Sequence, residues 1–309
     1  RAGGDLGDGR AANSVKPKVE HMSNYKLLAL DLDGTLLGPT SRVSTANARA
    51  VRLAQQAGVQ IALCTGRNLT ESRAFNSQLE APADWIVIAN GAAAERLSDG
   101  VQLTFDGLDR QRCEAIFAVC AQFDTDPCLY TGDSLYYGRE FLRFLEEIRK
   151  RGTTALDETA DGYFFIDSWD KWRVLLDKED GRILKAILHD LNPKAVDRMM
   201  QTLEQTGLFE LAPSVMYGGA LKNVEINCKG VHKGQGLAQL AVQLGIGMDE
   251  VMAIGDSDND LTMLRMAGLG VAMANAAPHI RDAADVCTGS NAEDGVAQAV
   301  ERYILEGNA

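Results

Sequence analysis

Two aspartates, Asp31 and Asp33, lie directly after a short apolar run, in the string DLDGTL at residues 31–36. Residues two apart in an extended chain point the same way, so the two carboxylates can act together. One could attack phosphorus while the other transfers a proton. The pair could also hold Mg²⁺, which prefers carboxylate oxygens, and Gly34 permits the sharp turn that such a site needs. The string predicts phosphoryl-transfer chemistry rather than a polar loop that merely ends a strand.

A second acidic cluster lies far along the chain, in the string GDSDND at residues 255–260. Asp256 and Asp260 are four residues apart and can share one face of a helix. Like charges this close repel one another unless a cation binds, and a helix N-terminus relieves only part of the repulsion. A calcium loop is the competing interpretation, but the EF-hand positions for glycine and glutamate are not filled. The cluster favours Mg²⁺, which needs few protein ligands beside water and phosphate.

Two further features fit a phosphate group. Thr65 and Gly66 stand at a predicted strand-to-helix turn, where a hydroxyl and free backbone N–H groups suit a phosphate oxygen. Ordinary helix capping by Thr65 is the alternative. Lys233 begins a predicted helix, and a cation there would offset negative charge on a nucleophile and a transferring group. On its own Lys233 would be interpreted as a solvated surface residue.

The elements expected around these residues alternate between strand and helix. Apolar runs predict buried strands at 27–30, 59–63, 85–89, 251–254 and 269–272. Helical patterns lie between them, one beginning at Ser44 and ending at Gly58, another running over 237–244 and ending at Gly245, and a last one over 296–305. This alternation predicts an α/β fold with a Rossmann-like parallel-sheet core. Ligands of such sheets bind beyond the carboxyl ends of the strands, where the sequence places Asp31, Thr65, Asn90 and Asp256.

The middle of the chain differs in composition, because it holds most of the aromatic residues. Its predicted strands, at 163–167 and 183–188, are short. A helix is expected from Asn192-Pro193, a cap followed by proline at the first helical position. We interpret residues 92–221 as an inserted α/β cap domain and residues 23–91 and 222–309 as the core. Residues 1–22, Gly-rich and ending in His21-Met22, are interpreted as an expression tag, with a natural tail as the alternative.

The overall composition bounds the partners. The 309 residues carry a net charge of -12 at pH 7, so we expect neither a nucleic acid nor an anionic membrane surface as partner. No stretch reaches the roughly 18 to 20 apolar residues of a membrane span. Six cysteines without C-x-x-C spacing indicate neither a zinc site nor a dense disulfide framework and fit a reducing, cytoplasmic setting. The oligomeric state is not predicted.

Taken together, these strings resemble the haloacid dehalogenase (HAD) superfamily, and more closely its Cof-type, sugar-phosphatase-like branch. The match covers most of residues 25–91 and 223–309 and extends to Asp294-Gly295-Val296-Ala297. The resemblance implies a Mg²⁺-dependent phosphatase that hydrolyses a small-molecule phosphomonoester, a sugar phosphate or similar metabolite, through an aspartyl-phosphate intermediate. It also implies that the cap closes over the site and recognises the leaving group.

The resemblance also implies a role for individual residues. Asp31 would be the nucleophile, Asp33 the group that protonates the leaving group and later activates water, and Lys233 the cation that steadies both nucleophile and phosphate. Phosphate binding would fall to Leu32 through its backbone, Thr65, Gly66, Lys233 and Asn259. Mg²⁺ would be held by Asp31, Asp256, Asp260 and the backbone carbonyl of Asp33. Asn90 and Gly91 fit the loop that leads into the cap.

Several alternatives stay open at this point. A phosphomutase would use the same residues, and a non-catalytic protein that binds a phosphorylated metabolite would be expected to have lost Asp31, Asp33 or Lys233. The substrate is not predicted: sugar phosphates, pyridoxal phosphate, flavin mononucleotide and glycerate-type phosphates all remain. Four residues of the insert are candidates for substrate contact, with packing or surface roles as the alternative: Tyr136, Tyr137, Arg139 and Lys185.

Overall fold

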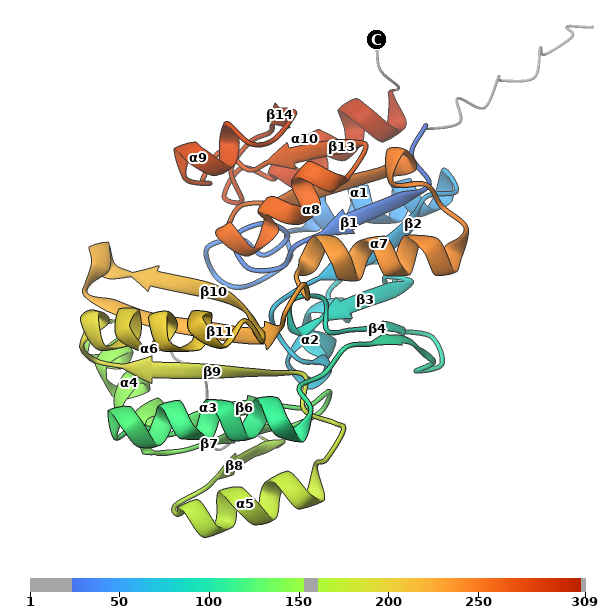
Figure 1. Ribbon diagram of the computed structural model, residues 1–309. Coiled ribbons are helices and arrows are strands. Elements are labelled where there is room, and N and C mark those ends of the chain that lie inside the picture. Colours follow the sequence, from blue (N-terminus) through green and yellow to red (C-terminus); the bar gives the residue numbers. More distant parts are fainter. Residues whose placement is uncertain (1–23, 153–160, 307–309) are drawn as a thin grey trace, which may run out of the picture.

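Two β-sheets organise the residues that the computed structural model describes, 24–152 and 161–306. The eight-stranded sheet with its helices occupies the upper and right parts of Figure 1, and the six-stranded sheet lies at the lower left. The predicted α/β fold with a parallel-sheet core is confirmed. Within these residues, no helix combines the length and the apolar character that a membrane crossing requires. The segment interpreted as an expression tag, residues 1–22, lies outside the described residues.

The eight-stranded sheet has the order β14-β13-β12-β1-β2-β3-β4-β5. The strands from β14 to β3 run parallel, and β4 and β5 are antiparallel additions at one edge. The four residues of β1 are fully buried, as expected for a central strand covered on both faces. The strands are β1 (Leu27–Leu30), β2 (Gln60–Cys64), β3 (Trp85–Ile88), β4 (Ala93–Arg96), β5 (Gln102–Phe105), β12 (Val251–Gly255), β13 (Leu269–Ala272) and β14 (Val286–Cys287).

Helices cover this sheet on both faces because the side chains of each strand alternate between the two sides. Leu28 and Leu30 of β1 pack on the side of α1, α2 and α10, whereas Leu27 and Ala29 pack on the side of α7, α8 and α9. The predicted cap at Ser44 is confirmed, since its side chain accepts a hydrogen bond from the backbone N–H of Asn47. The helices are α1 (Thr45–Gln56), α2 (Leu69–Asn76), α7 (Lys233–Leu244), α8 (Leu261–Met266), α9 (Pro278–Arg281) and α10 (Gly295–Val300), which continues as a π-helical turn over Glu301–Leu305.

The six-stranded sheet has the order β10-β11-β9-β6-β7-β8, with antiparallel neighbours except for the parallel pair β7 and β8. Helices α3, α5 and α6 pack on one face, and α4 packs on the other. Its strands are β6 (Pro127–Tyr130), β7 (Leu135–Tyr137), β8 (Tyr163–Phe165), β9 (Lys185–Asp190), β10 (Phe209–Met216) and β11 (Leu221–Cys228). Its helices are α3 (Arg110–Phe123), α4 (Arg139–Lys150), α5 (Trp169–Lys178) and α6 (Pro193–Thr206).

The described residues also form four short 3₁₀ turns, and two of these follow strands where the chain changes direction. They are Ala89–Gly91, Tyr217–Gly219, Met248–Glu250 and Asp258–Asp260.

The strand pairing differs from the boundaries drawn at residues 92 and 221. Strands β4 and β5 belong to the eight-stranded sheet, and β11 belongs to the six-stranded sheet. The short turn at Ala89–Gly91 joins β3 to β4, and strands joined by so short a connection pair with each other. The change in composition that marked the insert therefore begins before the chain leaves the first sheet. The chain crosses between the sheets after Phe105 and again after Cys228.

Candidate active site

The polar residues predicted at strand ends meet at one edge of the eight-stranded sheet. Strand β1 lies between β2 and β12 in parallel register, so Leu30 stands beside Leu63 and Ile254. Asp31, Thr65 and Asp256 each follow the last residue of their strand. Because parallel strands end at the same edge, three loops distant in sequence deliver their side chains to one place.

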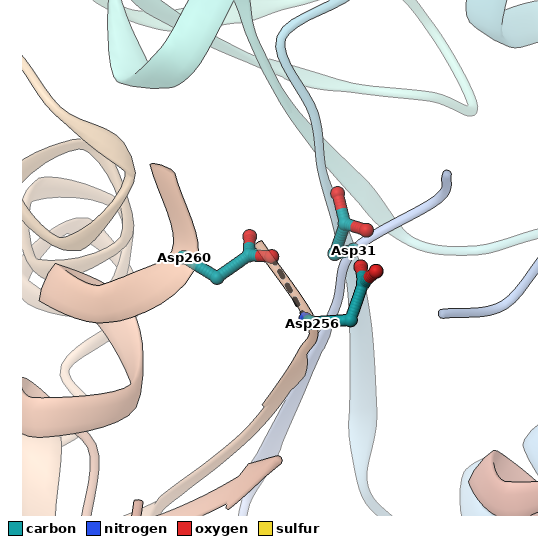
Figure 2. Close-up of side chains that lie close together, drawn as sticks. All are labelled: Asp31, Asp256 and Asp260. Carbon is teal, nitrogen blue, oxygen red and sulfur yellow. Dashed lines mark hydrogen bonds between the residues drawn. The ribbon is translucent and has the colours of Figure 1, made fainter. Parts of the chain in front are cut away.

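Three carboxylates gather at this edge (Figure 2). One carboxylate oxygen from each of Asp31, Asp256 and Asp260 lies within 4.8 Å of the others. Asp260 Oδ2 accepts hydrogen bonds from the backbone N–H groups of Asp256 and Ser257, both 3.0 Å long, which fixes the last carboxylate in place. In contrast, Oδ2 of Asp31 is buried and has no hydrogen-bond partner in the described part of the chain.

The clustering changes the acidity of two of these groups. Burial, with the nearby charge of Asp260, raises the pKa of Asp31 well above its usual range. The same two causes raise the pKa of Asp256 to about 6. Both shifts mean that placing several ionised carboxylates here is unfavourable without a compensating positive charge.

Lys233, at the start of α7, supplies one such charge. Its ammonium group is 1% exposed and donates to Asp31 Oδ1 and Asp260 Oδ1, each at 2.7 Å. Burial lowers the pKa of Lys233, but the carboxylates of Asp260 and Asp31 outweigh burial and raise it overall. The neighbouring His232 caps the helix by accepting a hydrogen bond from the N–H of Gln235. One ammonium beside three carboxylates still leaves an excess of negative charge.

Asp33 is separate from the carboxylate cluster. Arg67 binds both of its oxygens, with Nε to Oδ2 and Nη2 to Oδ1 each at 2.7 Å, and the Asp33 side chain is 52% exposed. The guanidinium group also lies over the ring of Phe75. Arg67 follows Thr65 and Gly66 in the sequence and was not among the predicted site residues. Its position three residues after the end of β2 is the signal that could have identified it.

Three of the predicted phosphate-binding residues, Thr65, Gly66 and Asn259, line the space beside these groups. Thr65 is buried, and its hydroxyl accepts a hydrogen bond from the N–H of Arg67. A Cβ placed on Gly66 would lie 2.9 Å from Oδ1 of Asn90, so glycine leaves room that any other residue would fill. Asn259 donates to that same Asn90 oxygen at 3.1 Å. Leu32 buries its side chain in the core, so any contact it makes with phosphate falls to its backbone.

Asn90 occupies a turn of unusual conformation. Ala89, Asn90 and Gly91 all have positive φ, at 49°, 59° and 101°, a region that costs energy for residues other than glycine. Asn227 of β11 donates a 2.9 Å hydrogen bond to the carbonyl of Ala89. Asn90 itself donates to Glu225 of β11. Contacts from the six-stranded sheet therefore hold this turn in place.

A cavity of about 520 Å³ extends from the carboxylates towards the six-stranded sheet. Its near end is lined by Asp31, Asp33, Thr65, Gly66, Arg67 and Asn259. Its far end is lined by residues of α4, β6, β9, β10 and β11. The arrangement offers a buried carboxylate, a cation and hydrogen-bond donors at one end, and a walled space for the rest of a small molecule at the other.

Residues 28–300 match the family model of the haloacid dehalogenase-like hydrolases. The chain belongs to this family. The predicted resemblance to its Cof-type branch is confirmed.

Individual relatives agree with this assignment. The chain is 30% identical over 289 residues to the 5-amino-6-(5-phospho-D-ribitylamino)uracil phosphatase YcsE of Bacillus subtilis, covering 91% of this chain and 97% of the relative. It is also 30% identical to the phosphatase YwpJ of Bacillus subtilis, covering 90% of this chain and all of the relative. This HAD-like hydrolase is an enzyme of the phosphoric monoester hydrolase class.

Solved structures share its fold. A haloacid dehalogenase-like hydrolase from Bacillus subtilis superposes with a TM-score of 0.76 at 29% identity, covering 89% of this chain and 99% of the other. The HAD phosphatase BT1666 of Bacteroides thetaiotaomicron superposes with a TM-score of 0.74 at 24% identity, covering 94% and 98%, and at this identity the likeness concerns the fold alone.

The carboxylate cluster of this hydrolase fits a divalent cation. Its donors are hard oxygen atoms, and its charge exceeds that of Lys233. The buried Oδ2 of Asp31 has no partner within residues 24–152 and 161–306. The carboxylate of Asp33 is engaged by Arg67. Any contribution of Asp33 to the metal would therefore come through its backbone carbonyl, as the resemblance implies.

Of the four candidate contact residues in the insert, Lys185 lines the cavity and the other three do not. Tyr136 points to the opposite face of the six-stranded sheet, where its hydroxyl donates to Glu179 at 2.7 Å. Tyr137 packs against Phe141 inside the α4 side of that sheet. Arg139 begins α4 outside the cavity lining. The residue types do not separate the cavity-lining Lys185 from the others, because the sequence of a short strand does not reveal which of its faces borders the cavity.

Proposed function

We propose that this HAD-like hydrolase is a Mg²⁺-dependent phosphatase that hydrolyses a small-molecule phosphomonoester through an aspartyl-phosphate intermediate on Asp31. The observation that carries the proposal is the environment of Asp31. Its carboxylate is buried at a strand end, where the residue lines the polar end of the cavity. One oxygen is held by Lys233, and the other has no hydrogen-bond partner among the described residues. A carboxylate so placed is aligned for attack and cannot drift into solvent.

The proposed reaction has two steps. In the first, an oxygen of Asp31 forms a bond to phosphorus, the bond from phosphorus to the ester oxygen breaks, and Asp33 gives its proton to that oxygen so that a neutral alcohol leaves. In the second, Asp33 takes a proton from water, the water oxygen bonds to phosphorus, and Asp31 is released as a carboxylate together with inorganic phosphate. Lys233 offsets the negative charge that Asp31 and the phosphoryl oxygens share in both steps.

Mg²⁺ would be held by Asp31, Asp256, Asp260 and the backbone carbonyl of Asp33. When bound, it would supply positive charge that offsets the phosphoryl oxygens, a large part of the catalysis that phosphoryl transfer needs. Thr65, Gly66, Asn259 and the backbone of Leu32 would orient the remaining phosphate oxygens, since all of them lie at the same strand edge.

Asp33 has to change its position during this cycle. Its carboxylate is bound by Arg67, and as an acid it must reach the ester oxygen of a substrate whose phosphate lies against Asp31. The side chain is half-exposed, so it has room to turn from Arg67 towards the cavity. We therefore assign Arg67 to positioning Asp33 between turnovers.

The proposed substrate class is a sugar phosphate or a similar small metabolite. The cavity volume of about 520 Å³ suits a molecule of this size. Two of the relatives are named as 5-amino-6-(5-phospho-D-ribitylamino)uracil phosphatases, which makes that compound a first candidate within the class. All six cysteines are unpaired, which supports placing the enzyme in the reducing cytoplasm.

The deciding experiment measures phosphate release from p-nitrophenyl phosphate and a panel of small phosphomonoesters. The intact chain is compared with Asp31→Asn, each with Mg²⁺ or with EDTA. We expect release that requires Mg²⁺ and falls at least about 10⁴-fold in Asp31→Asn. Asp258→Asn is the matched control, because Asp258 lies in the same acidic string but is exposed and pairs with His279. Mg²⁺-dependent release that survives in Asp31→Asn would refute the proposed nucleophile.

A further inference from the structure

The end of the cavity farthest from Asp31 has a composition of its own. Helix α4 covers it with aromatic and aliphatic side chains, and the tip of the β10–β11 hairpin adds two more. We call this region the distal chamber. Its apolar lining residues are Phe141, Phe144, Leu145, Ile148, Ile187, Met216 and Tyr217.

Two polar groups in the distal chamber have no partner in the part of the chain that the structure describes. His189 is 3% exposed, and its ring lies against those of Phe141 and Phe144, with centroids 5.3 and 4.8 Å away. Within residues 24–152 and 161–306, no hydrogen bond reaches its ring nitrogens. The side-chain oxygen of Asn223 on β11 is likewise buried without a partner. Buried polar groups are normally paired, so each of these is free to bind a ligand.

His189 carries no charge in this environment. Burial, reinforced by the charge of Lys185, lowers the pKa of His189 to about 3. A neutral imidazole offers one hydrogen-bond donor and one acceptor, and the Asn223 oxygen offers an acceptor. The chamber can therefore bind a group that has both N–H donors and acceptors on its edge and an apolar face between them.

An ion pair lies between the chamber and the catalytic end. Lys185 of β9 is buried and donates to Glu225 of β11 at 2.9 Å, while its ammonium group lies 4.6 Å from the ring centre of Tyr130. The pair adjoins the predicted phosphate site, since a Cβ on Gly66 would lie 3.3 Å from Glu225 Oε2 and 3.6 Å from Lys185 Nζ. A donor and an acceptor side by side suit the hydroxyl groups of a sugar or polyol chain.

The charges along the cavity disfavour a second anionic group on the substrate. The two cations among its described lining residues are Arg67 and Lys185, and each is already paired, with Asp33 and with Glu225. Burying a further phosphate or carboxylate beside these pairs would leave its charge uncompensated. The leaving group is therefore expected to be neutral.

We infer that the distal chamber binds a flat, nitrogen-containing ring, carried on a short hydroxylated chain whose other end bears the phosphate. The ring packs against the aromatic residues and its polar edge bonds to His189 and Asn223. The hydroxyl groups of the chain meet Lys185 and Glu225. This inference rests on the proposed function and narrows its substrate class to ring-bearing polyol or sugar monophosphates with a neutral leaving group.

The first test compares two substrates that share a chain and differ in the ring. These are 5-amino-6-(5-phospho-D-ribitylamino)uracil and ribitol 5-phosphate. Stacking and edge hydrogen bonds should raise kcat/KM for the ring-bearing compound at least about tenfold over the other. Equal kcat/KM values for the two compounds would overturn the inference while leaving the phosphatase proposal intact, and so would turnover of p-nitrophenyl phosphate with neither compound accepted.

The second test removes the polar edge contacts by Asn223→Ala and His189→Phe, the latter keeping an aromatic ring in the packed site. We expect kcat/KM for the ring-bearing compound to fall about tenfold in each, mainly through KM. Lys222→Ala is the control, because Lys222 neighbours Asn223 but faces Asp197 on the other side of the sheet. A ring preference that stays at the wild-type value in both variants would overturn the assignment of the chamber.

A binding measurement separates failure of the inference from failure of the proposed function. Calorimetry of Asp31→Asn with the unphosphorylated compound 5-amino-6-(D-ribitylamino)uracil needs no catalysis. Saturable binding that weakens in the double variant with Asn223→Ala supports the chamber even if no ester is hydrolysed. Absence of binding together with Asp31-dependent hydrolysis of p-nitrophenyl phosphate refutes the chamber alone.

Discussion

The two ends of the cavity are built in different ways from the same kind of element. At the catalytic end, the functional side chains follow strand ends, so that Asp31, Thr65 and Asp256 come from loops beyond a parallel sheet. From the Lys185–Glu225 pair into the distal chamber they project from within strands, on alternate residues such as Lys185, Ile187 and His189 of β9. The first end depends on loop strings that are contiguous in sequence, whereas the second depends on a face shared by separate strands.

The two ends also differ in what stabilises them. The catalytic end concentrates carboxylates around one buried ammonium group, which is costly for the fold. The distal chamber is mainly apolar and belongs to the same packing that holds α4 against its sheet. At the first end, loss of a carboxylate should therefore trade stability against activity, and loss of the ammonium group should lower both. Mutations at the second end should affect mainly substrate affinity. The following experiments test that contrast, from the largest expected effect to the smallest.

The strongest effect is expected for Lys233→Met. Removal of the ammonium group leaves the carboxylates of Asp31 and Asp260 buried without it, which should lower the free energy of unfolding by about 3 to 5 kcal/mol. The kcat for p-nitrophenyl phosphate should fall by about 10²- to 10³-fold. Urea unfolding in EDTA and steady-state kinetics measure the two quantities. Lys229→Met, which changes an exposed lysine nearby, is the control, and equal stability of the two variants would contradict the role of the buried ion pair.

Asp256→Asn should move stability and activity in opposite directions. Loss of one carboxylate from the crowded cluster should raise the unfolding free energy of the metal-free protein at pH 7.5 by about 1 to 3 kcal/mol. Activity should nevertheless fall at least about 100-fold, because a proposed metal ligand is lost. A variant that is both active and unchanged in stability would contradict the proposed cost of the cluster.

The cost of ionising Asp256 should also appear in how the unfolding free energy of the metal-free protein varies with pH. The folded-state pKa of Asp256, about 6, lies above its ordinary value of 3.8, so the folded protein binds this proton more tightly than the unfolded chain does. The stability that the proton on Asp256 contributes to the folded protein is fully present below pH 3.8 and is lost as the pH rises through 6. Unfolding curves between pH 4 and pH 7 should show this decline in wild type and a smaller one in Asp256→Asn.

Gly66→Ala affects the point where the two ends meet. The added methyl group would press on Asn90 and Glu225, which are fixed by hydrogen bonds to each other and to Asn259 and Lys185. We expect kcat/KM to fall about tenfold, with a loss of less than about 2 kcal/mol in stability. Gly132→Ala is the matched control, since a Cβ there meets no atom within 4 Å. Equal activity of the two variants would contradict this prediction, because it would show that Asn90 and Glu225 can shift without loss of catalysis.

The smallest effect is expected for Tyr217→Gly, at the tip of the β10–β11 hairpin. Tyr217 has a φ of 51°, which costs energy in a residue with a side chain, and glycine removes that cost while adding flexibility to the unfolded chain. Stability should therefore change by less than about 1 kcal/mol. The KM for the ring-bearing substrate should rise about fivefold as an aromatic wall is lost. A fall in kcat without a change in KM would contradict a role confined to the distal chamber.

The contrast between the two ends also explains what could be predicted from sequence. The strings at 31–36 and 255–260 are short and contiguous, and each follows an apolar run that marks a strand. The carboxyl ends of parallel strands lie at the same edge of the sheet, so the fold class alone predicts that the two strings meet there. The α/β class, the helix beginning at Ser44 and the meeting of Asp31 with Asp256 and Asp260 were predictable for this reason.

The distal chamber could not be predicted in the same way. His189 and Asn223 are single polar residues within strands, and their shared face depends on the register between β9 and β11, which pairs His189 with Asn223 directly. A strand of three to six residues does not reveal which face will be covered, so Tyr136 and Lys185 looked alike in sequence although they face opposite sides. The pairing of Arg67 with Asp33 was missed because it joins two loops through side-chain rotamers alone.

The double passage of the chain between the two sheets has a mechanical consequence. The outgoing segment after Phe105 and the returning segment after Cys228 touch, since the thiol of Cys228 donates to the carbonyl of Gly107 at 2.9 Å. Two neighbouring attachment points act as a pair of pivots: swinging about the line through them bends both segments slightly, whereas twisting or sliding would stretch one against the other. We therefore expect relative motion of the two sheets mainly along the direction that widens or narrows the cavity between them.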